Sequence, residues 1–144
     1  MLALAQAHGA RGRHDEALPL LRRAAAIAPP QARPFALARL AAGLVALGRV
    51  DEGIDSFARA LAGFDEVDID PALVGDVEES FATALWSAAR PTEARAAAAR
   101  ARDAYVDADQ GERADAVQAW LDAHPDPSPL TRSPPARSQT PRRR

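Results

Sequence analysis

The sequence predicts an all-α protein, in which antiparallel helix pairs stack into an α-solenoid that is followed by a capping helix and a disordered tail. Composition is the first indication: the chain has 36 alanines, all 18 of its basic residues are arginine, and both residue types lose little entropy in a helix. Apolar residues also recur at helical spacing over most of the chain. Finally, one stretch of sequence recurs at offsets of 36 and 41 residues, as expected of a repeat protein.

The repeated stretch is 12-GRHDEALPLLRRAAAIAP-29, which aligns without a gap with 48-GRVDEGIDSFARALAGF-64. A weaker third copy is 89-ARPTEARAAAARARDAY-105, in which Thr92-Glu93-Ala94 replaces the Asp-Glu-small triplet. The acidic insertion 65-DEVDIDP-71 explains the longer second offset if it lengthens one loop.

Each copy follows a second apolar run with helical spacing, so each unit is predicted to be a helix pair. Gly12 and Gly48 are expected to end the first helix of their pairs, because glycine adopts a left-handed conformation without steric cost. The following acids, including His14-Asp15-Glu16, would open the second helix, and Pro19 would fall near its first turn. The upstream apolar positions are Leu4, Ala7 and Ala10; Leu37, Leu40, Ala41 and Leu44; and Val77, Phe81, Ala82 and Leu85.

The second helices carry apolar stripes that should form the core. Small residues at Ala17, Gly53 and Ala94 would let paired helices approach closely. The predicted stripes are Ala17, Leu20, Leu21, Ala24, Ile27 and Ala28, and then Ile54, Phe57, Ala60, Leu61 and Phe64.

The segment 111-GERADAVQAWLDAHP-125 is predicted to form a further amphipathic helix that caps the stack. Its apolar side would consist of Ala116, Ala119, Trp120 and Ala123. Residues 125–144 hold six of the 12 prolines and show no apolar periodicity, so they are predicted to be disordered. Within them, Ser133 and Thr140 precede prolines and are phosphorylation candidates.

This pattern resembles the tetratricopeptide repeat family: a small residue in the first helix, a turn glycine, Asp-Glu-Ala, a bulky residue, Ala and a closing Pro. Repeat two lacks the closing proline, and repeat three has Ala89 at the turn. The resemblance implies repeats at about 1–30, 34–64 and 72–107 and a capping helix at 111–124, within a domain of residues 1–124. The matching positions are Ala5, Gly12, Ala17, Leu21, Ala24 and Pro29 in repeat one, and Ala41, Gly48, Gly53, Phe57 and Ala60 in repeat two.

The resemblance also implies a protein-interaction scaffold that binds a peptide or protein in a concave groove lined by the first helices. The groove is expected to be mostly apolar with an acidic end, which favours an apolar or basic helical segment as partner. In the alternative interpretation, these side chains pack against neighbouring repeats or the final helix. The groove positions are Leu2, Gln6, Phe35, Ala38, Ala42, Val45, Asp76, Glu79, Thr83 and Trp86.

The C-terminal half has a narrower resemblance. The stretch 81-FATALWSAARPTEARAAAARARDAY-105, followed by Trp120-Leu121-Asp122-Ala123-His124, is similar to the last repeats of large bacterial serine/threonine protein kinases. This implies an alternative function, the regulatory tail of a signalling kinase, with the kinase domain and further repeats lying upstream in a parent chain.

No catalytic motif is visible, and an enzyme, a cofactor or a metal site is not expected. His14-Asp15-Glu16 are consecutive residues that point in different directions and cannot form a triad by adjacency. The run 43-GLVALGRV-50 lacks the Lys and Ser or Thr of a phosphate-binding loop. The acidic stretch 65–79 lacks the glycine and glutamate positions of a calcium loop.

The charge distribution argues against nucleic acid as a partner. Residues 1–124 hold 13 arginines against 19 acidic residues, a net charge of −6, whereas residues 125–144 hold five arginines against one aspartate. Phosphate binding needs clustered positive charge, which the acidic body lacks. The chain has no cysteine, no signal peptide and no apolar run long enough to span a bilayer, so we expect a soluble cytoplasmic protein without membrane contact.

Overall fold

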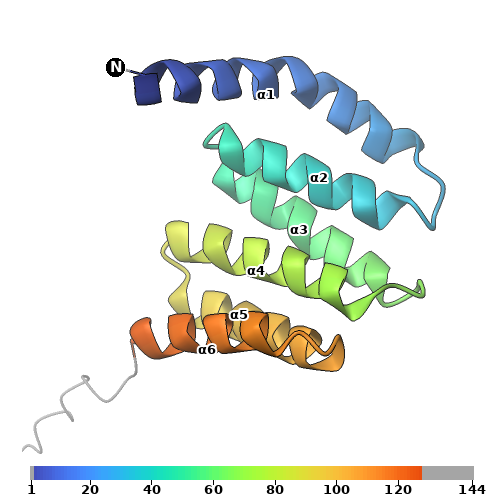
Figure 1. Ribbon diagram of the computed structural model, residues 1–144. Coiled ribbons are helices and arrows are strands. Elements are labelled where there is room, and N and C mark those ends of the chain that lie inside the picture. Colours follow the sequence, from blue (N-terminus) through green and yellow to red (C-terminus); the bar gives the residue numbers. More distant parts are fainter. Residues whose placement is uncertain (1, 128–144) are drawn as a thin grey trace, which may run out of the picture.

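The computed structural model describes residues 2–127, with side chains from residue 12 onwards (Figure 1). Over these residues the regular structure is entirely helical, which confirms the all-α prediction. The helices are α1 (Leu2–Ile27), α2 (Arg33–Ala46), α3 (Val50–Phe64), α4 (Pro71–Ser87), α5 (Pro91–Asp107) and α6 (Gly111–Ala123).

Consecutive helices pack side by side. The most extensive pairs are α2 with α3 and α4 with α5, while α1 lies against α2, α3 against α4 and α6 against α5. In Figure 1, α2, α4 and α6 lie on the near side of the stack, with α3 and α5 behind them. The first helices of the two pairs, α2 and α4, also contact each other directly. This places side chains from both pairs on one face of the molecule.

Three of the connections share one backbone conformation, in which a left-handed residue follows the C-cap residue of the helix. Gly48 has a φ of 79°, and Ala89 and Asp109 each have a φ of 58°. At the first turn, the Arg49 amide donates to the Leu44 carbonyl at 2.9 Å and the Gly48 amide donates to the Val45 carbonyl at 2.9 Å. The same pair of bonds forms at the other two turns, so each is a Schellman C-cap that satisfies the helix's terminal carbonyls.

An arginine–glutamate pair joins two of these turns to the helix that follows. Arg49 donates to Glu52 at 2.6 Å, and Arg90 donates to Glu93 at 2.9 and 2.6 Å. The hydrogen bond from Arg90 is the main cause of a lowered pKa for Glu93. Because each glutamate lies in the first turn of its helix, its charge also suits the positive end of the helix dipole.

Helix α1 differs from the prediction for repeat one. It runs unbroken from Leu2 to Ile27 and has Pro19 in its interior, so the predicted turn at Gly12 and the helix pair at 1–30 are wrong. His14, Asp15 and Glu16 lie in mid-helix and do not open a helix. Glycine permits the left-handed conformation but does not require it, and Gly12 is helical in α1.

The buried face of α1 is also rotated from the predicted stripe. Leu18 and Ala25 are buried against the α2 side chains Leu37, Leu40 and Leu44. Two predicted core residues are instead exposed, Leu20 at 70% and Ile27 at 73%. The predicted stripe is wide enough for two neighbouring helices, whereas α1 packs mainly against α2, with Arg22 also paired to Glu52 of α3.

Helix α6 forms where it was predicted but buries a different face. Ala114, Val117 and Leu121 are buried, whereas the predicted positions Ala116, Ala119 and Ala123 are exposed and Trp120 is half-buried. Alanine is too small to mark a core face unambiguously, so the direction of the neighbouring helix α5 decides which side is covered.

The remaining core follows the predicted pattern in α2 and α3. The predicted α2 positions and most of the predicted α3 positions are buried, with Leu61 half-buried. The acidic insertion forms the loop between α3 and α4, and Asp70 ends it by accepting the Ala72 amide at 2.9 Å. Of the predicted disordered tail, residues 128–144 lie outside the described residues.

The turn geometry predicts opposite effects of two substitutions. A non-glycine residue in the left-handed region costs about 1–2 kcal/mol, while a glycine costs about 0.5–1 kcal/mol through the entropy of the unfolded chain. Ala89→Gly should therefore raise the free energy of unfolding by about 0.5–1 kcal/mol, and Gly48→Ala should lower it by about as much. Urea denaturation of both variants and the wild type tests this; a loss of stability in Ala89→Gly would contradict it.

Candidate functional site

An open depression of about 310 Å³ lies between α2 and α4. Its walls are Ala42, Val45 and Ala46 from α2 and Ser80 and Thr83 from α4, and Phe57 of α3 also lines it. Phe57 is almost fully buried and packs against Phe81, with ring centroids 6.1 Å apart. The depression therefore rests on the core and offers a mainly apolar surface.

The two hydroxyl groups of the depression are already used. Ser80 donates to the Asp76 carbonyl at 3.0 Å, and Thr83 donates to the Glu79 carbonyl at 3.1 Å. Such bonds to the preceding helical turn satisfy the hydroxyl hydrogens within the helix. The depression thus offers few free hydrogen-bond donors, which suits apolar side chains better than polar ones.

A polar cluster lies one helical turn before Ser80 and Thr83. The Tyr105 hydroxyl lies 2.7 Å from Glu79 and 2.9 Å from Asp76, and it accepts a hydrogen bond from Arg113 at 2.8 Å. Arg113 also pairs with Asp76, and its guanidinium lies 4.2 Å from the centre of the Tyr105 ring. Because a phenol has one hydrogen to donate and Asp76 already has Arg113, we assign that hydrogen to Glu79.

This cluster keeps Tyr105 a neutral hydrogen-bond donor. Burial is the largest cause of its raised pKa, and the neighbouring carboxylates of Glu79 and Asp76 raise it further. A Cβ atom at Gly75 would lie 2.6 Å from the Tyr105 ring, so the ring's place depends on that glycine. Glu79 itself is exposed, and its only described partner is the neutral phenol. Its negative charge remains available to a ligand.

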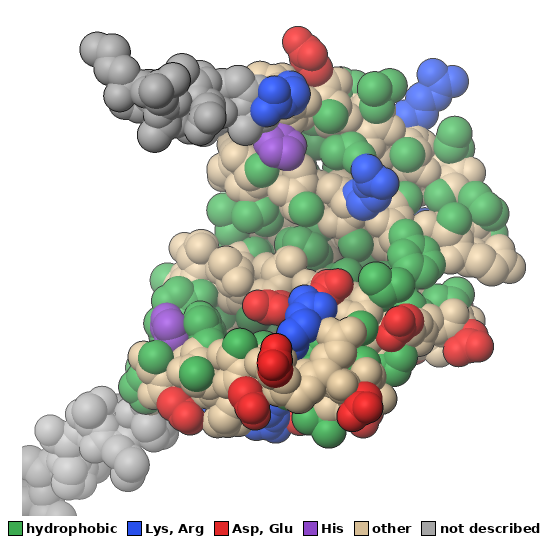
Figure 2. Space-filling view, in the orientation of Figure 1, with side chains coloured by type: hydrophobic (Ala, Val, Ile, Leu, Met, Phe, Trp, Pro, Cys, Tyr) green, Lys and Arg blue, Asp and Glu red, His purple; other side chains and the backbone are tan. Residues whose placement is uncertain are grey.

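Figure 2 shows the same side of the molecule as Figure 1. Acidic side chains gather over its lower half, where α4 and α6 lie, and hydrophobic side chains are prominent above them. The face therefore changes from apolar to acidic along the stack of helices.

The predicted groove residues separate into two groups. Ala42, Val45 and Thr83 line the depression, and Asp76 and Glu79 belong to the polar cluster beside it. The side chains of Leu2 and Gln6 lie outside the described residues. Sequence reasoning missed Ala46 and Ser80 as lining residues and treated Phe57 as core alone, although the helical spacing of Ala42, Val45 and Ala46 could have indicated the full α2 wall.

Other predicted groove residues pack elsewhere, in line with the alternative interpretation of these positions. Phe35 makes an edge contact with Phe64, with ring centroids 5.2 Å apart, and Ala38 packs against the core between α1 and α2. Both lie towards the start of α2, away from the depression.

Trp86 belongs to an aromatic cluster that fastens α6 to α4. Its ring centroid lies 5.5 Å from that of Trp120 and 4.8 Å from that of His124, and Trp120 and His124 stack at 4.2 Å. Arg95 of α5 also holds α6 in place by donating to the Leu121 carbonyl at 2.7 Å. Trp86 is 36% exposed, but the contacts of its ring are structural.

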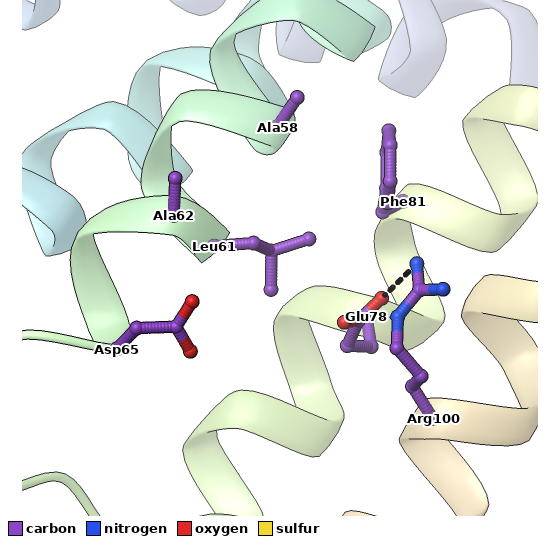
Figure 3. Close-up of a pocket in the computed structure, with 7 residues that line it drawn as sticks. All are labelled: Ala58, Leu61, Ala62, Asp65, Glu78, Phe81 and Arg100. Carbon is purple, nitrogen blue, oxygen red and sulfur yellow. Dashed lines mark hydrogen bonds and ion pairs between the residues drawn. The ribbon is translucent and has the colours of Figure 1, made fainter.

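A second depression, of about 340 Å³, lies between α3 and the α4–α5 pair (Figure 3). Figure 3 shows Leu61 and Phe81 projecting into it, with Asp65 on the side opposite Arg100. Glu78 lines it but is buried, and Arg100 donates to both of its carboxylate oxygens at 2.8 and 3.1 Å. Sequence reasoning missed this pair, because Glu78 occupies the place of the apolar Leu37 in the preceding repeat.

Burial dominates the electrostatics of Glu78. Removal from water raises the pKa of its carboxyl, and the hydrogen bonds and charge of Arg100 lower it only in part, so the pKa stays above its ordinary value. Arg100 remains half-exposed. The pair thus compensates a buried charge. The free energy needed to remove such a charge from water usually exceeds the free energy gained from the ion pair.

The described residues hold no group of three or more acidic, histidine or cysteine side chains arranged for a metal ion. None of the helices described is long and apolar enough to cross a membrane.

Comparisons with family models, with curated proteins and with solved structures found no match to this chain.

The Glu78–Arg100 pair predicts a pH-dependent loss of stability. Arg100→Gln removes the groups that hold down the pKa of Glu78, so at neutral pH it leaves a poorly compensated buried carboxylate and should cost about 1–3 kcal/mol. Lowering the pH protonates Glu78 and should shrink this deficit, because the raised folded-state pKa makes stability recover as pH falls through it. Urea denaturation across pH 4–8 measures the difference from wild type.

Two controls sharpen that test. Compared with Glu78→Gln alone, the double variant Glu78→Gln/Arg100→Gln should show a deficit that does not change with pH, because neither protein has the titrating group. Arg59→Gln should show little of it, because Arg59 occupies the equivalent position beside Leu37. A deficit of Arg100→Gln that is the same at pH 4 and pH 7 would refute the assignment to Glu78.

Proposed function

We propose that this chain is a tetratricopeptide-like interaction module, an α-solenoid that binds a peptide or helical segment across α2 and α4. The observation that carries the proposal is the apolar depression of Ala42, Val45, Phe57 and Thr83, with the exposed carboxylate of Glu79 one helical turn away. An apolar floor with a charge at its edge is the usual design of a surface that binds a side-chain anchor and fixes its direction.

The repeated turns support the solenoid part of the proposal. The left-handed residue and its two backbone hydrogen bonds recur at Gly48, Ala89 and Asp109. Because the same turn closes each of these helices, the chain enters the next helix at a similar angle each time. Equivalent helix pairs need such a constant angle to stack into a regular array.

The site favours a particular partner chemistry. A leucine-sized side chain that is fully buried contributes about 1.5–3 kcal/mol, and the depression accepts such groups without needing hydrogen bonds from them. A lysine or arginine beside the anchor would reach Glu79, whereas an acidic residue there would be repelled. Helical segments present such side chains at spacings of three and four residues. The small area of the site favours a weak, transient complex.

Selection from a library of helical peptides tests the proposal without knowledge of the natural partner. Enriched peptides should share apolar residues at helical spacing and a basic residue at one end. Their affinity, measured by fluorescence anisotropy, should fall as salt rises, because the contact with exposed Glu79 is screened. Enrichment of acidic peptides would contradict the proposed chemistry.

Matched variants locate the binding face. Ala42→Arg places a charged side chain in the depression and should weaken binding by at least about tenfold, equivalent to about 1.4 kcal/mol. Ala96→Arg makes the same change at an exposed alanine of α5 and should leave the affinity unchanged. Equal binding by wild type and Ala42→Arg would exclude this face.

A second variant tests the polar edge alone. Glu79→Gln keeps an acceptor for the Tyr105 hydroxyl but removes the charge. We expect a severalfold loss of affinity at low salt and a flatter salt dependence, because rim charges act mainly through screened attraction. An unchanged salt dependence would assign the charge preference to another acidic residue.

A further inference from the structure

Helix α1 has an apolar face that no described helix covers. Leu18, Leu21 and Ala25 turn towards α2, but Leu20 is 70% exposed and Ile27 is 73% exposed. Ala24 between them is exposed as well. Two large aliphatic side chains on one helical face, left in water, indicate a surface that is covered in the assembled protein.

The repeat alignment shows what kind of element belongs on this face. With the offset of 36 residues, Ala17, Leu20, Ala24 and Ile27 correspond to Gly53, Ser56, Ala60 and Gly63 of α3. Ser56 and Ala60 are buried. A Cβ atom on Gly53 would lie 2.5 Å from Val45, and one on Gly63 would lie 2.6 Å from Pro34. Val45 and Pro34 belong to α2, so this face of α3 is covered by α2. The equivalent face of α1 is the one that remains exposed.

The segment that should cover α1 is present in the chain but cannot reach this face within its own chain. Residues 2–11 correspond to the later part of α2, and the sequence there is rich in Leu and Ala. Because α1 is unbroken and rises by about 1.5 Å per residue, this segment points away from Leu20 and Ile27. The sequence 12-GRHDE that follows it matches 48-GRVDE. The second of these forms a turn between α2 and α3, whereas the first is helical within α1.

We propose that residues 2–11 of a second copy of this chain cover the exposed face of α1 from Ala17 to Ala24. The two α1 helices would lie antiparallel about a two-fold axis, each supplying the first helix that the other lacks. This is a domain swap in which the hinge at Gly12 stays helical and does not turn. The contacts that the two helices of one repeat would make within a chain then form between two chains.

The α2–α3 contacts give the register of this pair. Gly53 lies opposite Val45, and the offset of 36 residues places Ala17 opposite Gly9 of the second copy. Continuing along the antiparallel pair, Leu20 meets the stretch around Ala5 and Ala24 meets the stretch around Leu2. In this register Ile27 lies beyond Leu2 of the second copy. The two-fold axis then passes near Arg13. Small residues at Gly9 and Ala17 permit the close helix approach seen at Gly53.

The first test is the mass of the full chain in solution, measured by analytical ultracentrifugation. The wild type should sediment as a dimer. Leu20→Glu should weaken dimerisation at least tenfold, because a carboxylate would be buried in the apolar contact. Leu73→Glu is the matched control, since Leu73 is also a leucine exposed on a helix, at 45%, and it should leave the dimer intact. A monomeric wild type, or a dimer indifferent to Leu20→Glu, would overturn the proposal.

The second test distinguishes exchange between chains from a hairpin within one chain. The protein has no cysteine, so the double variant Gly9→Cys/Ala17→Cys introduces the only thiols, and a disulfide needs the two Cα atoms within about 7 Å. Mild oxidation should give a covalent dimer on a non-reducing gel. A covalent monomer would show that the segment folds back on its own chain, and absence of any disulfide would show that it covers neither; both results refute the exchange.

The outcome is independent of peptide binding, because neither Leu20 nor Gly9 lines the depression between α2 and α4.

Discussion

The left-handed residue at the end of a helix is the constraint on which the arrangement of this protein depends. At Gly48, Ala89 and Asp109 the chain reverses direction, and the same two backbone hydrogen bonds satisfy the carbonyls of the helix that ends there. Two of these reversals make α2 run antiparallel to α3 and α4 antiparallel to α5. The direct contact of α2 with α4 then brings Ala42 and Thr83, which are 41 residues apart, to one depression. Where the same sequence pattern stays helical, at Gly12, an apolar face remains uncovered.

Close helix approach is the second requirement, and small residues provide it. Gly53 lies against Val45 and Gly75 lies against the Tyr105 ring, at distances that leave no room for a Cβ atom. Much of the remaining core is alanine, so no helix buries much area alone and each relies on its neighbour. Gly75 has a further effect on the candidate site. By admitting the Tyr105 ring beneath α4, it brings the hydroxyl to Glu79 and Asp76.

The helix pairs at 33–64 and 71–107 could be predicted from the sequence, because helical periodicity marks the helices, Gly48 marks the turn of the first pair, and an acid lies in the first turn of the second helix of each pair. The predictions that were wrong or missing concern features that depend on contacts between distant residues. Glycine at position 12 allows both a turn and a helix, and the pattern Gly-Arg-x-Asp-Glu that it shares with Gly48 does not distinguish them. The stripe containing Leu20 and Ile27 is apolar whether one or two helices cover it. Burial of Glu78 depends on Arg100, which lies on another helix.

Within the candidate site, Ala42 and Val45 could be inferred from spacing. The pairing of Tyr105 with Arg113 could not, because it joins α5 to α6 and depends on how these helices pack.

Charge pairing decides which of the two carboxylates at the site can act on a partner. Asp76 and Glu79 lie on the same face of α4, and position alone would make them equal. Arg113 pairs directly with Asp76 and acts on Glu79 only by longer-range attraction, while the hydrogen bond to Glu79 comes from the neutral phenol of Tyr105. A neutral donor stabilises a carboxylate without cancelling its charge, and the raised pKa of Tyr105 keeps that donor protonated. The network therefore holds Glu79 in a fixed place with its charge intact, beside an apolar depression whose own hydroxyls are already bonded. This division between the two carboxylates is the basis of the proposed selectivity for a basic residue next to an apolar anchor.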